Sequence, residues 1–430
     1  MMLSTYDRVP ATAHHKEVWL SMQQGSEAAR AWTYPVHIDL NGQLDRAALE
    51  SALRIIIQRH QAFRSTISDD GMYLHVYRSI DACLNVEDLS GLQDPDLALT
   101  EFANREAATP FDLSQPSLFR THLLKVSDER HVLVLAFCHL VVDGGAIAIV
   151  LDELAALYSF LSDGRKAVLP PADQLTDYMA AVDEERQSDK FAKARDYWSS
   201  VFASAPPMMD VPGDELRPAM RTFASHEVAT FLDADLPTDV KAFAKQTKVS
   251  LFFALLAAKI ICLSRWSGQR DICVGVPAAG NHALGFGNVV GHCIDMVPLR
   301  VELNDSEALC DFLVRLRGLF YEAIGNQIFT FSDILREMSI PRSIDRPPLI
   351  PVVFNLNPSS DIDRFGTLDA GLLDMPRYAE NFEIFFNLYD EGDTIKAVVT
   401  CNKALYSSAL VDERFEDFKT GLHGFISGGH

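Results

Sequence analysis

One stretch of the sequence combines residue types and spacing that suit acyl-transfer chemistry. His139 is followed at fixed spacing by Asp143 and Gly144, in a His-x-x-x-Asp-Gly pattern. An imidazole can accept a proton near neutral pH, and backbone N–H groups at the start of a helix can stabilise a developing oxyanion. The pattern therefore predicts a base beside an oxyanion donor. A single histidine at a strand end can equally be structural, so the motif alone leaves both interpretations open.

The segments on either side of the motif predict how its residues are held. Residues 132–137 are a short block of branched or bulky apolar side chains, which is typical of a strand buried on both faces. After a double glycine, apolar residues recur at helical spacing and predict a helix over 147–161. We therefore expect His139 at the end of a strand, and Asp143 and Gly144 in the turn into a helix.

The composition limits the possible classes of function. With 430 residues, 48% hydrophobic and 23% charged, the chain is expected to fold into roughly two or three globular domains. Because the net charge is −21 and no basic cluster offsets it, nucleic acid is not an expected partner. No Cys-x-x-Cys pair and no glycine-rich phosphate loop are present, so the sequence predicts no metal site, no disulfide framework and no bound cofactor.

The distribution of apolar residues predicts no membrane association. The longest apolar run, over 251–263, is interrupted by Lys259 and is too short to cross a bilayer. The first residues lack a basic segment followed by an apolar one. We therefore expect a cytoplasmic protein with reduced thiols, and a monomer.

Alternating helical and strand patterns predict an α/β protein with two lobes, an N-terminal lobe over 1–174 that carries the motif and a C-terminal lobe over 175–430. The break is a segment at 163–174 that is rich in proline and charge. The first lobe is expected to contain helices over 44–58 and 147–161 and strands over 74–77, 118–124 and 131–137. The second is expected to contain helices over 177–202, 236–246, 250–264, 307–323 and 408–425, strands over 272–276 and 297–301, and a hairpin over 382–400.

With these elements placed, the chain resembles the condensation domains of nonribosomal peptide synthetases over nearly its whole length. Residues 138–144 are similar to the family's His-His-x-x-x-Asp-Gly motif, with Cys138 in place of the first His. Residues 59–64 resemble its Arg-His-x-x-Leu-Arg segment, and residues 291–300 resemble its Gly-x-Phe-Val-Asn-Thr-x-x-x-Arg motif. Further matches occur in the family's order at 12–19, 177–178, 264–277, 326–327 and 342–349.

The resemblance implies a fold and a reaction. The implied fold is two chloramphenicol-acetyltransferase-like lobes that form a V-shaped pseudo-dimer with a central tunnel. The implied reaction is amide (peptide) bond formation, in which a carrier-bound aminoacyl acceptor attacks a carrier-bound acyl or peptidyl thioester. Substrates would arrive on the phosphopantetheine arms of donor and acceptor carrier proteins, so these carriers and adjacent synthetase modules are the expected partners.

The resemblance also implies roles for single residues of the motif. His139 would act on the attacking amine as a base or a positioning group, and the Gly144 N–H is the expected oxyanion donor. Asp143 would be structural and paired with Arg300. Arg64 is the other candidate partner, or a plain salt bridge.

Further residues near the site are expected to set its subtype. Cys138 would pack and not attack, because consecutive strand residues point to opposite faces. By resemblance, Asp295 lies near the tunnel together with the pair His292 and Cys293, and these residues would mark a subtype that accepts unusual donors. Asn355 and Asn357, after a strand, either line the tunnel or are turn residues.

Two other functions stay open at the level of sequence. One is a condensation-like acyltransferase that forms an ester or uses a free acceptor, which nothing in the chain excludes. The other is a non-catalytic condensation-like domain that recruits a partner enzyme. The altered residue at Cys138 suggests this function, and the intact His139, Asp143 and Gly144 argue against it.

Overall fold

The computed structural model describes residues 6–81, 84–233, 235–358, 362, 365–375 and 377–427. The chain divides into two compact units. Unit 1 consists of Met1–Glu184, Ala279–Ile294 and Ser360–Pro376, and unit 2 consists of Glu185–Ala278, Asp295–Ser359 and Arg377–His430. The predicted division at residue 174 therefore does not match the units, because unit 1 takes up two segments from the second half of the chain.

The main sheet of unit 1 has five strands in the order β12-β2-β7-β6-β5. These are β12 (Asp369–Leu373), β2 (Thr33–Asn41), β7 (Arg130–Cys138), β6 (Phe119–Lys125) and β5 (Leu84–Asp88). Neighbours are antiparallel, except that β5 and β6 are parallel. Residues 132–138 of β7 are all buried, which confirms the prediction of a strand covered on both faces. A small antiparallel sheet joins β1 (Tyr6–Pro10), β4 (Tyr73–Tyr77) and β3 (Ser65–Ile67).

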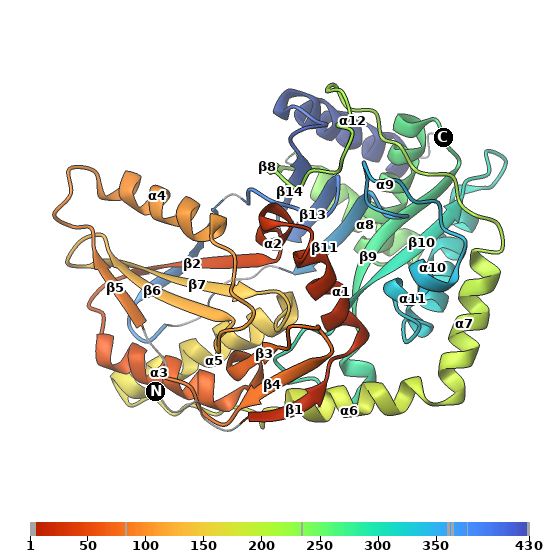
Figure 1. The fold of residues 1–430 in the computed structure, drawn as a ribbon. Coiled ribbons are helices and arrows are strands. Elements are labelled where there is room, and N and C mark those ends of the chain that lie inside the picture. Colours follow the sequence, from red (N-terminus) through yellow and green to blue (C-terminus); the bar gives the residue numbers. More distant parts are fainter. Residues whose placement is uncertain are drawn as a thin grey trace. The chain divides into compact units, whose positions relative to one another are not determined.

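Helices cover both faces of the five-stranded sheet (Figure 1). Leu133, Leu135 and Phe137 of β7 belong to the core that contains α3 (Arg46–Arg59) and α5 (Gly144–Asp163). Val132 and Val134, on the opposite face of β7, pack instead with α4 (Pro95–Ala108). The remaining helical elements of this part of the chain are α1 (Ala13–Met22), α2 (Ser26–Arg30), η1 (Gln61–Arg64), α6 (Leu175–Arg186) and η2 (His282–Leu284).

Unit 2 is built on a six-stranded sheet in the order β10-β9-β11-β13-β14-β8. These are β10 (Ile294–Glu302), β9 (Asp271–Ala279), β11 (Val352–Pro358), β13 (Ile384–Asp390), β14 (Ile395–Asn402) and β8 (Ser225–Phe231). β11 lies parallel to both β9 and β13, whereas β14 lies antiparallel to β13 and β8. The antiparallel pair β13 and β14 confirms the predicted hairpin.

Helix α9 (Leu251–Ser267) is buried along most of its length. It packs against α8 (Leu236–Thr247), α10 (Leu309–Gly325) and α12 (Ser408–Ile426). The other helices of unit 2 are α7 (Asp189–Val201) and α11 (Phe331–Glu337). The predicted single helix over 177–202 is in fact two helices, α6 and α7, because Ser188 caps the start of α7 with its side chain.

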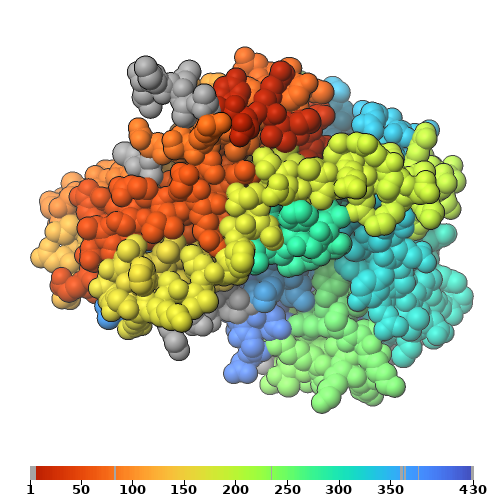
Figure 2. All heavy atoms as spheres, turned by 90° about the horizontal axis from the view of Figure 1, so that it is seen from below, coloured from red at the N-terminus to blue at the C-terminus, as the bar shows by residue number. Residues whose placement is uncertain are grey.

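One helix of the described residues, α5, is long and apolar enough to cross a membrane by length and composition alone. Half of its apolar window is buried within the protein, since Ile147, Val150 and Leu154 belong to the core of unit 1. Its end and the segment that follows it are exposed, including Phe160 and Val168, and this yellow region lies at the surface in Figure 2. Helices α8 and α9 pass the same test only as a pair bent by 105°.

Candidate functional site

His139 lies directly after the last residue of β7, where the backbone is fixed on both sides. Its N–H donates to the carbonyl of Trp32 at 2.8 Å, and the Val141 N–H closes a turn onto the Cys138 carbonyl at 3.0 Å. β2 reinforces this end of β7, because Thr33 is the register partner of Cys138. The side chain of His139 is half-buried. The predicted place of His139, at the end of a buried strand, is confirmed.

Aromatic rings surround the His139 imidazole. The Trp32 ring lies nearly perpendicular to it with ring centroids 5.6 Å apart, and the Tyr34 ring lies 6.3 Å away. The third ring is His292, whose Nδ1 is 3.1 Å from Nδ1 of His139. Both nitrogens belong to unit 1, because residue 292 is part of the inserted segment 279–294.

His292 is a buried, neutral histidine. Its side chain is 6% exposed. Burial holds its pKa well below the ordinary histidine value, and the neighbouring His139, His14 and His15 act in the same direction. No group of three or more His, Cys, Asp or Glu side chains within the described residues is arranged to hold a metal ion.

Asp143 is a structural residue, as predicted, but its partners differ from the prediction. Its Oδ1 accepts the N–H of Ala146 at 2.8 Å, which caps α5, and its Oδ2 accepts the N–H of Cys293 at 2.8 Å. Burial raises the pKa of the Asp143 carboxyl, and these backbone N–H groups oppose that rise. The carboxylate thus ties the start of α5 to the segment that carries His292.

The predicted ion pair between Asp143 and Arg300 is wrong. Arg300 belongs to unit 2, where its guanidinium contacts Asp271, with Nη2 and Oδ2 2.7 Å apart. It also donates to the carbonyls of Val201 and Ser204. The physical reason is that backbone N–H groups already satisfy both oxygens of Asp143, so this buried carboxylate does not depend on a cation.

Arg64, the other candidate partner, binds backbone carbonyls. It donates to Ile57 and Gln58 at the end of α3, and to Tyr77 and Arg78. Its guanidinium therefore caps the C-terminus of α3. Within the described residues Arg64 forms no ion pair, so the alternative of a plain salt bridge is also wrong. The ion pair in this segment comes instead from Arg59, whose Nε lies 2.9 Å from Glu153, and Nε2 of His60 lies 2.8 Å from the same carboxylate.

The start of α5 is accessible at Gly144. Gly144 and Gly145 are exposed, and an added Cβ at Gly144 would meet no heavy atom within 4 Å. As at any helix start, the Gly144 N–H has no partner within the helix. Exposed N–H groups at the positive end of a helix are suited to bind an oxyanion.

Cys138 is fully buried at the end of β7. Burial raises the pKa of its thiol to about 12, so the thiolate that a nucleophilic cysteine needs is disfavoured. This geometry agrees with the interpretation of Cys138 as a packing residue.

The remaining candidate residues belong to unit 2. Asp295 is buried and accepts the N–H of Phe331 at 3.1 Å, at the start of α11. Asn355 and Asn357 lie within β11, so the alternative of turn residues is wrong. Their amides form a polar row along the sheet, in which Asn355 donates to Asn357 and Asn357 donates to Asn387 of β13. That these residues line a tunnel stays a prediction.

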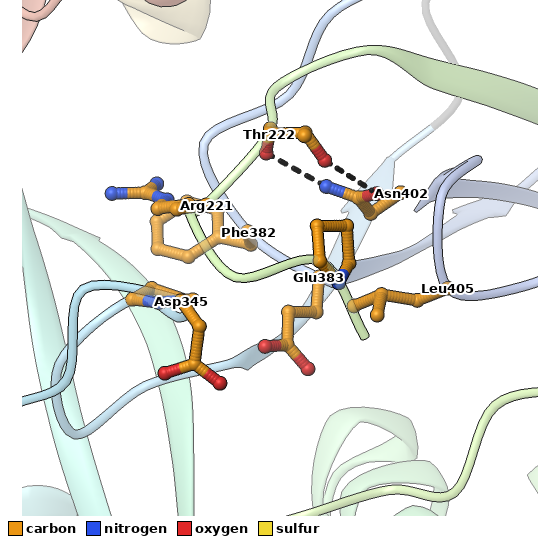
Figure 3. Close-up of a pocket in the computed structure, with 9 residues that line it drawn as sticks. Arg221, Thr222, Asp345, Phe382, Glu383, Asn402 and Leu405 are labelled. Atoms are coloured by element: carbon orange, nitrogen blue, oxygen red, sulfur yellow. Dashed lines mark hydrogen bonds between the residues drawn. The ribbon is translucent and has the colours of Figure 1, made fainter. Parts of the chain in front are cut away.

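Unit 2 also contains a small open pocket with charged and polar side chains in its wall (Figure 3). Its charged groups are engaged with one another. Glu383 accepts two hydrogen bonds from Arg217, at 2.6 and 3.1 Å, and Asn402 bonds both the side chain and the carbonyl of Thr222. In Figure 3 the Arg221 guanidinium points away from Thr222 and Asn402. These contacts indicate a structural network that joins the connector before β8 to β14.

Several residues of the His139 site were not predicted from the sequence. Trp32 and Tyr34 belong to a segment that was not predicted as a strand, and His292 was considered only as a subtype mark. A sequence separation of 153 residues hides the contact between the two imidazoles. The one signal in the sequence was that His292 falls within a segment, residues 291–300, that resembles a family motif.

Comparison with known proteins places the whole chain in one family. The family model of the condensation domain matches residues 7–430. The chain is 31% identical over 418 residues to tyrocidine synthase 2 of Brevibacillus parabrevis, and 28% identical over 408 residues to malpinin synthetase of Mortierella alpina. These matches cover 95% and 94% of this chain, but only 11% and 5% of those proteins. The chain thus spans a small part of the length of the relatives it matches.

Two solved structures show the same fold. The first condensation domain of the calcium-dependent antibiotic synthetase superposes with a TM-score of 0.81 at 21% identity, over 98% of this chain and 97% of that one. The X-domain in its complex with OxyB from teicoplanin biosynthesis superposes with a TM-score of 0.84 at 21% identity, over 98% and 94%. With its two α/β units and its full-length family match, the chain belongs to the condensation domains of nonribosomal peptide synthetases.

Proposed function

We propose that the chain catalyses amide bond formation between a carrier-bound acyl or peptidyl thioester and a carrier-bound aminoacyl acceptor. The observation that carries this proposal is the position of His139, a half-buried imidazole at the end of β7 beside the exposed first turn of α5. Donor and acceptor carrier proteins and adjacent synthetase modules would be the partners. The reaction would take place in the cytoplasm, with both substrates on phosphopantetheine arms and no bound cofactor.

The chemistry needs one proton acceptor. A free α-amine has a pKa near 8 and attacks only when unprotonated. As the new N–C bond forms and the C–S bond breaks, one proton leaves the nitrogen. His139 would accept this proton and pass it to the departing thiolate. Because a thioester is already activated, no acyl-enzyme is required, and the buried Cys138 thiol needs no part in the step.

The start of α5 would stabilise the tetrahedral intermediate. The Gly144 N–H is the proposed donor to its oxyanion, supported by its exposure and by the helix dipole. Holding two tethered reactants side by side would supply a further part of the acceleration. In this proposal Asp295, Asn355 and Asn357 contact the acyl chains or the arms.

The test is reconstitution with loaded carriers. A panel of acyl groups on a donor carrier and of amino acids on an acceptor carrier is incubated with the chain, and the products are identified by intact-protein mass spectrometry. His139→Ala should lower the rate by about 100-fold or more with little change in melting temperature. His131→Ala, on the same strand, is the matched control and should be close to wild type. Product formation by His139→Ala at the wild-type rate would refute the assignment.

A second candidate function is recruitment of a partner enzyme. The X-domain structure, which was solved in complex with OxyB, is as similar in fold as the condensation domain of the antibiotic synthetase. A chain with this function would form no product from any loaded pair. The same panel with hydroxyacyl acceptors separates amide from ester formation, because base cleaves an ester bond within the released product but leaves an amide bond intact.

A further inference from the structure

We propose that His292 is a positioning residue for His139: it accepts the Nδ1 proton of His139 and thereby makes Nε2 the atom that takes the proton of the attacking amine. This inference rests on the proposed function of His139. It assigns to the inserted segment 279–294 a part in setting the protonation pattern of the site.

The contact between His139 and His292 requires a proton on one of the two facing nitrogens. The two Nδ1 atoms are 3.1 Å apart, with ring centroids 5.0 Å apart and planes at 77°. A hydrogen bond between two neutral imidazoles needs a proton on one nitrogen and a lone pair on the other. Therefore one of the two rings is the Nδ1–H tautomer and the other is the Nε2–H tautomer.

The surroundings of His292 decide which ring is the donor. The His292 ring also hydrogen-bonds the backbone of Val142, and this bond favours its protonated form, as expected for a ring N–H that donates to a carbonyl. Because Nδ1 faces His139, Nε2 is the nitrogen that in this proposal donates to Val142. His292 is thus the Nε2–H tautomer, its Nδ1 is an acceptor, and His139 must donate from Nδ1.

The groups around His292 keep it neutral. It is 6% exposed, and its pKa lies well below the ordinary value, chiefly because of burial. The ring of His14 lies 6.2 Å away, and His15 is fully buried with its own pKa lowered to about 3. The carboxylate of Asp143 contacts the next residue, Cys293, through its backbone N–H. His292 can therefore act as a fixed acceptor while His139 gains and loses a proton.

The backbone holds His292 firmly in this place. Asp143 binds the Cys293 N–H, the Gly280 N–H donates to the Cys293 carbonyl at 3.1 Å, and Asp173 accepts the Asn288 N–H at 2.9 Å. Gly291 permits close packing on α6, because an added Cβ there would lie 2.8 Å from Leu175. Because the backbone on both sides of His292 is held in place, its ring is suited to orient the His139 imidazole.

The direct test observes the tautomer. Histidine ¹⁵N spectra of the free protein, assigned with His139→Ala, should show His139 protonated at Nδ1 and not at Nε2. In His292→Phe, which keeps a ring but removes the acceptor, His139 should become a mixture of tautomers. His292→Gln, which restores an acceptor, should recover part of the wild-type pattern. An unchanged His139 spectrum in His292→Phe would overturn the proposal. This measurement needs no substrate.

Kinetics supply the second readout, with the loaded carrier pair that gives product with wild type. His292→Phe should lower kcat by about 10- to 100-fold with little change in KM, since it removes part of the general-base contribution. Loss of the acceptor should also lower the pKa of His139, because a protonated ring donates more strongly, so the acid limb of the pH profile moves to lower pH. His282→Ala, in the same inserted segment but exposed, should leave both unchanged.

The outcomes separate this inference from the proposed function. If His139→Ala is inactive while His292→Phe keeps the wild-type rate and pH profile, only the positioning role fails. If His139→Ala is fully active, the proposed function fails, and the ¹⁵N spectra still decide whether the tautomer is set by His292.

Discussion

Replacing Asp143 with alanine should destabilise unit 1 through backbone hydrogen bonds and not through a lost ion pair. The side chain is 3% exposed, and its two oxygens accept the N–H groups of Ala146 and Cys293, each at 2.8 Å. Both donors lose their partner in Asp143→Ala. The segment that carries His292 then loses its direct bond to the start of α5.

The magnitude follows from these two bonds. Loss of a helix N-cap costs about 1 kcal/mol, and leaving the buried Cys293 N–H unsatisfied costs about 1–3 kcal/mol more. The sum is about 2–4 kcal/mol, which corresponds to a fall in melting temperature of about 4–16 °C for a unit of roughly 200 residues. Asp94→Ala is the matched control, because Asp94 is an exposed cap of α4 whose side chain accepts the Leu97 N–H at 2.9 Å. It should cost only about 1 kcal/mol.

Differential scanning calorimetry measures both variants, and Arg300→Ala tells the two explanations apart. Because Arg300 pairs with Asp271, its effect and that of Asp143→Ala should add without coupling in the double variant. A coupling energy of about 1 kcal/mol or more, or an Asp143→Ala variant that melts like Asp94→Ala, would refute the reasoning.

Two further predictions concern buried charge and access to the site. Lys259 lies on α9 beside the rings of Trp266 and Phe386, and burial lowers its pKa from 10.5 to about 7. The unfolded chain therefore binds more protons than the folded chain between about pH 7 and 10.5, so the free energy of unfolding should rise with pH in this window. Lys259→Met should flatten this rise and should increase the free energy of unfolding at pH 7 by roughly a few kcal/mol. Urea titrations at several pH values measure this, and an equally steep rise in Lys259→Met would contradict it. Gly144→Ala should keep or slightly raise the melting temperature, because nothing lies within 4 Å of the new methyl group. The same variant should slow condensation of the loaded carriers by about 10-fold or more if the Gly144 N–H contacts the oxyanion. An unchanged rate would count against that role.

The sequence predicted those elements of the fold whose apolar pattern reflects burial. Strand β7 and helices α5 and α9 carry long apolar stretches, and each was placed within a few residues of its observed bounds. Elements with a mostly exposed or mixed pattern were not predicted, among them β5, β12 and α4. Their formation depends on partners that are distant in sequence, which a local pattern does not contain.

Strand β2 shows the same limit at the centre of the sheet. Its sequence includes Pro35, His37 and Asp39, and a proline argues against a central strand. In the structure Pro35 pairs with Ala136 of β7 on one side, whereas β12 pairs only with residues 37–41 on the other. β2 is thus an edge strand at Pro35, where the missing N–H breaks no ladder. Tyr34 lies on this strand and Trp32 directly precedes it. Because the strand was not predicted, these two aromatic neighbours of His139 were not predicted either.

The roles within the motif were predictable in part for the same reason. The places of His139 at a strand end and of Asp143 at the entrance of a helix follow from local sequence, since both are local features. The partner of each side chain does not. A buried carboxylate can be satisfied by a cation or by backbone N–H groups, and only the fold shows that the inserted segment brings the Cys293 N–H to Asp143.

This contact gives the spacing of the motif a physical meaning. Asp143 caps α5 with one oxygen, and with the other it holds the segment in which His292 precedes Cys293. One carboxylate thereby ties the helix start that begins at Gly144 to the segment that carries the proposed acceptor of the His139 Nδ1 proton. Asp143→Asn, which keeps one carbonyl oxygen but presents an NH₂ group to one of the two donors, should therefore impair the His139 tautomer or the helix cap according to the oxygen that is lost. The ¹⁵N spectra and the melting temperature of this variant report the two effects separately, and a variant with both unchanged would show that the carboxylate does not couple them.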